Sequence, residues 1–396
     1  MATFKTISSA DIKTTRSVLN QLVDFVEEDI SGSTTRKKYQ VFVTSSAGGG
    51  NTNAVTSSLF HTVFDQNFGL QTANEIFDVT YGIFSGSNHV TGALIGTDVN
   101  GKQLFTSQSV MMREKINIYK QFAQNLLGNG DGRFRAPFSS TSATDDIDTA
   151  LFLCFKRLFV RDGIKRETFA MRFFQSASRG PTEQNLQATA VHCPSSSVIF
   201  TDVGAASSIE RSQFGGDVGN IVLASDTSQT VGLMFYQQGI AILDLERALD
   251  STQSMTGSVD SVGFLNKHVM SGSFVPDFVT SASMDDILDH VCTVRFGSGS
   301  NTFLTFQNNT KINSTLVFCR ATADEFNYSS NPSYTEPDGR VVVIDESQAN
   351  EQKSFSFVST IGLYDANEEL LATAKLSRPV EKNSEKDLTF RVRLDF

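Results

Sequence analysis

Apolar residues at intervals of three and four predict helices in three stretches of the chain. The stretches are residues 14–30, 107–127 and 144–158, where this spacing gives a helix one apolar face. Thr144 is the predicted cap of the third helix, and acidic residues in its first turn suit the helix dipole. The predicted core face of this third helix is Ile147, Leu151, Cys154, Phe155 and Leu158.

Alternating residues and short apolar runs predict strands through most of the remaining chain. The predicted strands are 38–44, 76–84, 168–174, 198–201, 220–224, 303–306, 314–320, 340–344, 355–364, 370–376 and 388–396. Residues 231–243 predict a hairpin that turns at Gln237-Gln238-Gly239, and short helices are expected near 262–269 and 284–291. Asn308-Asn309 and Asp365-Ala366-Asn367 are predicted turns between the C-terminal strands.

The order of these elements predicts a β-rich α+β protein. We expect several antiparallel β domains with a few packed helices, and a β-sandwich at the C-terminus. The predicted domains are an N-terminal α+β domain over 1–105, a central α+β domain over 106–292 and the sandwich over 293–396. The last strand has the most regular alternation: Leu388, Phe390, Val392, Leu394 and Phe396 share one face.

Composition narrows the classes of function. Charged residues make up 19% of the chain, below the ~25% usual for soluble proteins, and such lightly charged surfaces suit burial against partners. The formal net charge of −10 argues against a dedicated nucleic-acid binder. No apolar run approaches the ~18 residues of a membrane span.

The cysteine pattern and the N-terminus predict assembly in a reducing cytoplasm. The four cysteines are scattered and form no C-x-x-C pair, so we expect buried thiols and neither a zinc site nor another cofactor. The first residues are polar, which predicts that no secretory signal is present. The cysteines are Cys154, Cys193, Cys292 and Cys319.

Motifs that carry catalytic chemistry are missing. The chain has no G-x-S-x-G elbow, P-loop or H-E-x-x-H motif, and Gly48-Gly49-Gly50 is interpreted as a loop. None of the five histidines is spaced to share a metal with another, namely His61, His89, His192, His268 and His290. Asp145-Asp146 and Asp244 with Glu246 could be taken for acid/base pairs, but their places at element ends explain them. We therefore predict no enzyme, with no catalytic, cofactor-binding or metal-binding residue.

Two basic segments favour protein contact over nucleic acid. The denser one runs from Lys156-Arg157 through Lys165-Arg166 to Arg172, and it predicts ion pairs between subunits because it lacks the aromatic spacing of a base-stacking surface. The second, Arg36-Lys37-Lys38, opens a predicted strand and is interpreted as a solvated edge or an interface rim.

Three longer stretches carry a family resemblance. They are Lys13-Thr14-Thr15-Arg16 to Tyr39-Gln40-Val41-Phe42-Val43; Ser109-Val110-Met111-Met112-Arg113-Glu114-Lys115 with Phe152-Leu153-Cys154-Phe155-Lys156-Arg157; and a C-terminal block that includes Glu325-Phe326-Asn327-Tyr328-Ser329-Ser330-Asn331-Pro332, Thr360-Ile361-Gly362-Leu363-Tyr364-Asp365 and Arg391-Val392-Arg393-Leu394-Asp395-Phe396. These stretches resemble a virion structural protein of contractile-tailed bacteriophages, especially marine and cyanobacterial myophages.

The resemblance implies a tail or baseplate component, most often a wedge subunit, with no catalytic residue to transfer. It implies homo-oligomers within a symmetric assembly, contacts with other wedge, tail or fibre proteins, and a place in the virion after assembly in the host cytoplasm. A receptor- or glycan-binding tail protein and a head or neck protein are the alternatives, and a tail-borne hydrolase is a third. The absence of Trp speaks against a glycan site.

Overall fold

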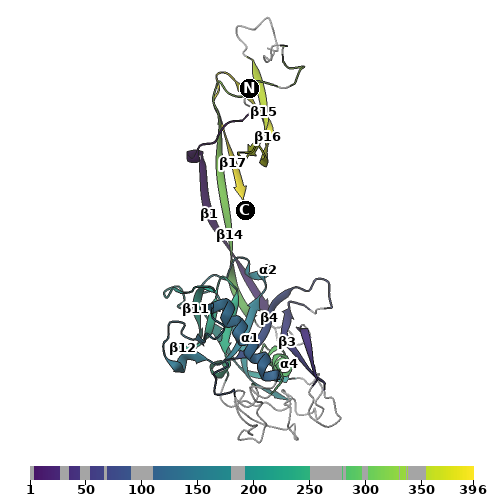
Figure 1. The fold of residues 1–396 in the computed structure, drawn as a ribbon, viewed down its shortest axis with the longest axis vertical. Helices are drawn as coiled ribbons and strands as arrows, with labels where there is room; N and C mark the ends of the chain where they lie inside the picture. The colour runs from purple at the N-terminus through teal and green to yellow at the C-terminus, as the bar shows by residue number, and fades with distance from the viewer. Residues whose placement is uncertain are drawn as a thin grey trace. The chain divides into compact units, whose positions relative to one another are not determined.

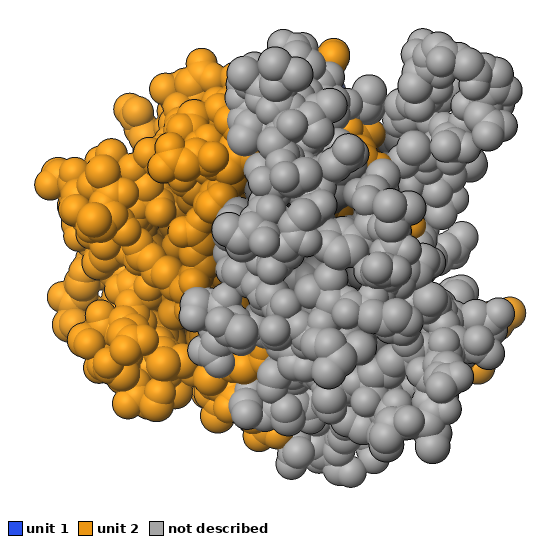
Figure 2. Space-filling model, turned by 90° about the horizontal axis from the view of Figure 1, so that it is seen from below, with its two compact units in different colours: residues 1–19, 311–396 blue, residues 20–310 orange. Residues whose placement is uncertain are grey.

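A computed structural model describes most of the chain, and its residue contacts divide the chain into two compact units. It describes residues 4–26, 35–44, 54–66, 69–90, 110–179, 192–249, 279, 282–296, 302–329, 331–335, 337 and 354–396. Unit 1 comprises 1–19 and 311–396, and unit 2 comprises 20–310, shown in orange in Figure 2. Strands β1 and β14 each contribute residues to both units. This division differs from the three consecutive domains that the sequence predicts.

Unit 2 contains a large antiparallel sheet with short helices. Along the sheet the strands follow the order β14-β8-β9-β11-β12-β13-β7-β4-β3-β2, and β10 pairs with β11. The strands are β2 (Thr35–Thr44), β3 (Ala54–Phe64), β4 (Glu75–Ile83), β5 (Phe134–Arg135), β6 (Asp146–Ile147), β7 (Thr149–Phe155), β8 (Ala170–Arg179), β9 (His192–Thr201), β10 (Glu210–Ser212), β11 (Gly216–Leu223), β12 (Asp226–Phe235) and β13 (Ile240–Asp244). The helices are α1 (Val110–Leu127), η4 (Ala143–Asp145), α2 (Arg157–Val160), α3 (Leu245–Ala248), α4 (Met284–His290) and the π-helical turn η6 (Val291–Arg295).

Strand β7 lies in the middle of this sheet, and both of its faces are buried. It pairs with β4 on one side and β13 on the other. Leu151 and Leu153 belong to one apolar cluster, and Ala150 and Phe152 belong to another on the opposite face. The predicted helix over 144–158 is therefore wrong. A continuous apolar run fits a strand buried on two faces as well as a helix, and periodicity does not separate the two.

The two faces of the sheet are covered by different helices. Helix α1 packs over β4 (Figure 1) and supplies Tyr119, Ala123 and Leu126 to one apolar cluster. Helix α4 supplies Ile287 and Leu288 to the cluster on the other face. Unit 2 therefore has the layered arrangement of an α+β domain, with the sheet between helices.

Phenylalanine fills much of the core on the α4 side. The ring of Phe77 lies 5.4 Å from that of Phe155 and 5.6 Å from that of Phe296, and Phe296 lies 5.0 Å from Phe303. Most of these ring pairs meet edge to face, the arrangement that aromatic quadrupoles favour. The many phenylalanines of the sequence thus connect β4, β7 and β14 in one aromatic core.

Unit 1 is built from five strands, two of which it shares with unit 2, and from a short helix near the start of the chain. Its elements are η1 (Ser9–Asp11), the first part of β1 (Ile12–Val26), the second part of β14 (Thr302–Ala321), β15 (Phe355–Tyr364), β16 (Leu370–Asn383) and β17 (Leu388–Asp395). β17 pairs antiparallel with β14 from Ser314 opposite Asp395 to Ala321 opposite Leu388, and β15 pairs with β16. Val317, Leu363 and Val392 form the buried centre between these two ladders. The β-rich α+β fold class is thus confirmed.

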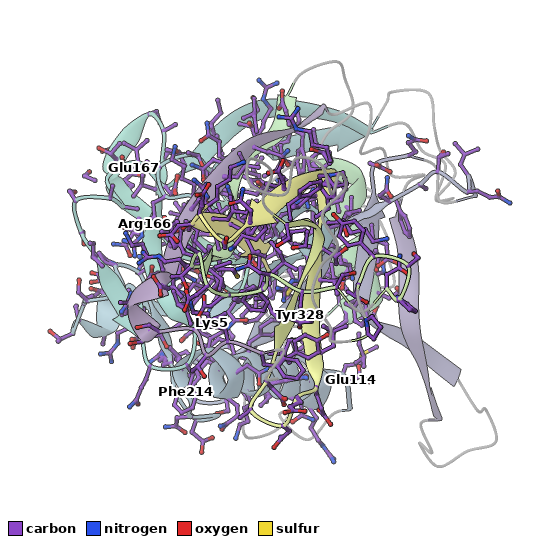
Figure 3. The ribbon with its side chains drawn as sticks, turned by 90° about the horizontal axis from the view of Figure 1, so that it is seen from above. Lys5, Glu114, Arg166, Glu167, Phe214 and Tyr328 are labelled. Carbon is purple, nitrogen blue, oxygen red and sulfur yellow. The ribbon has the colours of Figure 1, made fainter. Side chains whose placement is uncertain are left out.

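Polar contacts hold the 322–327 turn of unit 1 to its neighbours. The Lys382 side chain is fully buried, and its Nζ donates to Ala323 O at 3.1 Å, to Asn327 Oδ1 at 2.9 Å and to the main-chain oxygen of Asn383 at 2.8 Å. Lys5, labelled in Figure 3, pairs with Glu325 at 2.5 Å and lowers the pKa of that carboxyl to about 2. Each of these contacts stays within unit 1.

The N-terminal helix predicted over 14–30 is also wrong, because Ile12–Val26 is strand β1. β1 pairs with β14; Lys13 lies over the ring of Phe318, and the Gln21 amide donates to Asn308 Oδ1 at 3.2 Å. The stretch is rich in β-branched residues, which favour strands. Helical spacing was present without the buried face that would stabilise a helix.

The predicted turn at Asn308-Asn309 is wrong as well, because β14 continues through it for 20 residues. Asn308 donates its side-chain amide to Phe159 O at 2.8 Å, and the Asn309 amide donates to Gly163 O at 2.8 Å. These asparagines serve as hydrogen-bonding positions within a strand. Their preference for turns is outweighed by tertiary partners.

Several predicted elements are confirmed. The helix ending at Leu127, the strands near 38–44, 76–84 and 355–364, the 231–243 hairpin and the helix from Met284 are present within a few residues. Residues 45–53, 262–269 and 340–344 lie outside the described residues. No helix in the described ranges is long and apolar enough to cross a membrane.

Gly82 in β4 tests the contact between α1 and the sheet. A Cβ at this position would lie 2.7 Å from Tyr119 N and 2.9 Å from Lys115 O. We expect Gly82→Ala to lower the free energy of unfolding by about 1–3 kcal/mol, since helix backbone cannot yield locally. Gly130→Ala is the control, because its nearest atoms lie at 3.5 Å. Urea unfolding followed by circular dichroism measures both, and equal midpoints would contradict the packing.

Candidate functional site

Unit 1 leaves more large apolar side chains exposed than it buries. Among its described residues, the buried apolar side chains are Val317, Ala321, Leu363 and Val392. The exposed large ones are Phe4, Ile12, Val18, Leu19, Tyr328, Phe357, Tyr364, Leu370, Leu371 and Phe396. Single exposed apolar residues are normal, but such an excess in a small unit is typical of an interaction surface.

Strand β1 is the clearest part of this surface. Within unit 1, every residue from Ile12 to Leu19 is exposed, so the described residues of unit 1 cover neither face of this stretch. Val18 is 55% and Leu19 50% exposed, and the two point to opposite faces because neighbours in a strand alternate. Among the described strands, β1 pairs only with β14 and ends the strand order. It therefore offers two faces and an open edge.

Apolar side chains also gather on the β15–β16 ladder. Tyr364 packs edge to face on Phe4, with ring centroids 4.9 Å apart, and Gly362 leaves room for the Tyr364 ring. Leu370, opposite Tyr364 in the register, is 53% exposed. This group lies on the outer face of the ladder, because Ile361 and Leu363 point into the unit 1 core.

A group of ionisable side chains in unit 2 joins three arginines with four aspartates: Arg133, Arg135 and Arg247 with Asp145, Asp146, Asp148 and Asp244. Arg133 bonds Asp146 at 2.6 Å and also Asp148, and Arg135 bonds Asp146 at 2.5 Å. Of the aspartates that suggested a helix first turn, Asp146 and Asp148 are paired with arginines of the β5 segment, and Asp145 is paired with Arg247 at 3.5 Å. That correction follows from the strand pairing of β5 with β6.

Asp244 is the most perturbed acid of this network. Its carboxylate caps α3 by accepting from the Glu246 amide at 3.1 Å, and it pairs with Arg247 at 3.2 Å. Burial raises the pKa of Asp244 to about 7. Arg247 also donates to Ala136 O and Thr144 O, each at 2.6 Å. The predicted place of Asp244 at the end of the hairpin is confirmed, and the contacts fix α3 to its neighbours.

Glu246 on α3 faces His89. The His89 ring bonds the Glu246 carboxylate, and this hydrogen bond lowers the pKa of Glu246. The two residues come from segments far apart in sequence, so no spacing motif could have predicted their contact. Asp244 is buried, and its carboxylate already bonds a backbone amide and an arginine. The network is therefore better explained as a structural contact that holds α3 in place than as an acid/base site.

A second buried acid, Asp202, anchors two loops. Asp202 accepts from the Glu167 amide at 2.8 Å, from the Phe169 amide at 3.0 Å and from Tyr236 Oη at 2.8 Å. Burial raises the pKa of this carboxyl. Arg166 and Glu167, labelled in Figure 3, extend the cluster: Arg166 donates to Ala205 O at 3.0 Å. All of these hydrogen bonds join segments of unit 2.

The basic stretch of the sequence is used largely inside the chain. Lys156 pairs with Asp78 at 2.5 Å and Glu75 at 3.2 Å, and Arg166 pairs with Asp217 at 3.4 Å. The sequence predicts that these side chains pair between subunits. Lys156 and Arg166 instead pair with carboxylates of the same chain. The second segment, Arg36-Lys37-Lys38, lies on β2, which among the described strands pairs only with β3 and ends the strand order. The prediction that it opens a strand is confirmed, and its interpretation as a solvated edge or an interface rim stays a prediction.

The described histidines and cysteines do not gather at one site. His61 lies 3.1 Å from Asp285, and His290 accepts from Arg295 Nε at 2.9 Å. Cys154, Cys292 and Cys319 are not in disulfides, and burial raises the pKa of Cys154 to about 12. Within the described residues, no three His, Cys, Asp or Glu side chains gather in a way that could hold a metal ion. His268 lies outside them, as does the side chain of His192.

Comparison with protein families, with curated proteins and with solved structures finds no match to this chain. The interpretation of its function therefore depends on its own residues and geometry.

Asp244 predicts a measurable pH dependence of stability. The folded carboxyl has a pKa of about 7, above the ~3.9 of an unfolded aspartate, so the folded state binds the proton more tightly. The stability this provides is complete below pH ~4 and is lost as the pH rises to about 7. Asp244→Asn should remove up to about 4 kcal/mol of this dependence.

Urea midpoints between pH 4 and 8 measure the effect. Asp131→Asn is the control, since the Asp131 side chain is 78% exposed. The same slope in wild type and Asp244→Asn would contradict the assignment.

Proposed function

We propose that this chain is a structural component of a contractile-tailed bacteriophage virion, a baseplate wedge or tail scaffold protein rather than an enzyme. Its work is to assemble, through protein–protein interfaces, with copies of itself and with neighbouring virion proteins. The place in the virion is supported by the resemblance of the three sequence stretches. The mode of action is supported by the geometry of unit 1.

The observation that carries the proposal is the exposure of β1 on both faces. A strand in water needs a packed face to persist, and among the described strands β1 has β14 alone as its neighbour. Val18 and Leu19 lie on opposite faces and both are about half exposed. No described residue of unit 1 covers either face, and apolar burial against a partner is the main favourable term in association.

Unit 2 supports the proposal through its extensive internal packing. Its central strand is buried on both faces, and arginine side chains form ion pairs that join its segments. A protein that must hold neighbours in fixed positions gains from such a frame, because little order is then lost on assembly. The ionisable clusters of unit 2 stabilise this packed frame, which supports a scaffold more than a catalyst.

The double variant Val18→Ser/Leu19→Ser tests the proposal. Each change removes apolar area worth about 1 kcal/mol or more if it is buried on assembly, so incorporation into particles should fall at least about tenfold. Thermal unfolding of the isolated chain should change little, because both side chains are exposed. A tagged chain competing with wild type in infected cells, quantified by mass spectrometry of purified particles, measures incorporation.

Ile209→Ser is the matched control, because Ile209 is 74% exposed and lies in unit 2. This control should enter particles like the wild type. Equal incorporation of the double variant, or absence of the wild-type chain from particles, would refute the proposal.

A further inference from the structure

The outer edge of β17 has unused hydrogen-bonding groups. Asn313 and Phe396 exchange both of their main-chain hydrogen bonds, each at 3.0 Å, and the register of β17 on β14 runs on from this pair without a bulge. Bonded and non-bonded pairs alternate in an antiparallel ladder. The amides and carbonyls of Thr389, Arg391 and Arg393 therefore point away from β14. β17 pairs with no other strand of the described chain.

The outward face beside this edge is basic. Arg391 and Arg393 lie opposite Phe318 and Leu316 of β14, on the face turned away from Val317 and Val392 of the core. Lys13 lies over the ring of Phe318, 6.0 Å from its centroid, which places it on the same face.

Little intrachain charge balances these cations. Arg320, opposite Thr389, also belongs to the face. Arg393 pairs with Asp395 at 2.7 Å, whereas Arg320 and Arg391 have no ion-pair partner within the part of the chain that is described. A cluster of like charges without counter-charges is unfavourable on its own and favours an acidic partner.

The inward face of β17 is apolar. Phe390 and Leu394 point toward the unit 1 core but are only half-buried, because no strand lies beyond them in the described chain. A strand added at this edge would place one face over the apolar core and the other beside the arginines. Alternation along that strand would then be apolar and acidic.

We propose that the β17 edge binds an extended segment of a neighbouring protein in which acidic and apolar residues alternate. Main-chain bonds to Thr389, Arg391 and Arg393 would add the segment as a new strand, and its carboxylates would face Arg391 and Arg393. This deepens the proposed function by naming the chemistry of a partner. Nucleic acid is disfavoured as the occupant, since phosphate would leave the inward apolar row uncovered.

Labelled peptides test this on the full chain by fluorescence anisotropy. The probe is a peptide of about nine residues that alternates valine and glutamate, compared with a valine–lysine peptide of equal length. The glutamate peptide should bind saturably at up to millimolar concentration, and at least about tenfold more tightly than the lysine peptide. Arg391→Glu should remove that preference, while Arg378→Glu, exposed on β16, should not change it.

Thr389→Pro separates strand addition from simple charge attraction. Proline removes an amide that faces the open edge and leaves the arginines and the β14 ladder intact, so binding should fall several-fold without loss of thermal stability. Unchanged binding by Thr389→Pro, no saturable binding of the glutamate peptide, or tighter binding of a thymidine oligonucleotide would overturn the inference. Such results, with assembly still lost in Val18→Ser/Leu19→Ser, would leave the proposed function standing.

Discussion

Burial of apolar surface supplies most of the free energy of folding, and the two units of this protein do it to different degrees. Unit 2 encloses a phenylalanine-rich core whose central strand, β7, is covered on both faces. Unit 1 encloses little more than Val317, Leu363 and Val392 and leaves strand β1 uncovered. The difference is the constraint from which the proposed function follows, because a unit with a thin core and open strands gains stability when another molecule covers them.

The ion pairs and hydrogen bonds of unit 2 also stabilise its packed structure. The aspartates beside β5 and β7 are matched with arginines of the same chain, and Asp202 is matched with backbone amides and a tyrosine. Charges that are satisfied internally hold loops in place and leave few reactive groups exposed. The basic face beside β17 is the contrast: Arg320 and Arg391 have no counter-charge among the described residues. We therefore expect a partner at the unpaired arginines beside β17, rather than at the paired charges of unit 2.

How far the sequence predicts this fold depends on which residues decide each element. Strict alternation in 388–396 and the Gln237-Gln238-Gly239 turn predict β17 and the β12–β13 hairpin correctly, because local pattern and tertiary environment agree there. The predictions fail at 14–30 and 144–158, where apolar spacing suits a helix and a strand equally. β7 is decided by neighbours on both sides, and β1 by its ladder with β14, and neither is visible in a local window.

The candidate site could be predicted only in part. The alternation of arginine with apolar residues in β17 is legible in the sequence, but the open edge is not, since it depends on which strand pairs where. The exposure of Val18 and Leu19 contradicts the buried face that their spacing suggested. Asp244 and Arg247 lie at the junction of β13 and α3, and Glu246 of α3 meets His89 from a distant segment, so single-sequence motifs give no signal for their surroundings.

Hydrogen exchange of β1 and β17 tests the central claim most directly, measured by mass spectrometry on the chain alone and on the same chain in purified particles. The account predicts fast exchange of the outward-facing amides of both strands in the isolated chain and strong protection in the particle. Equal exchange in the two states, with those amides open to water in the assembled form, would contradict it.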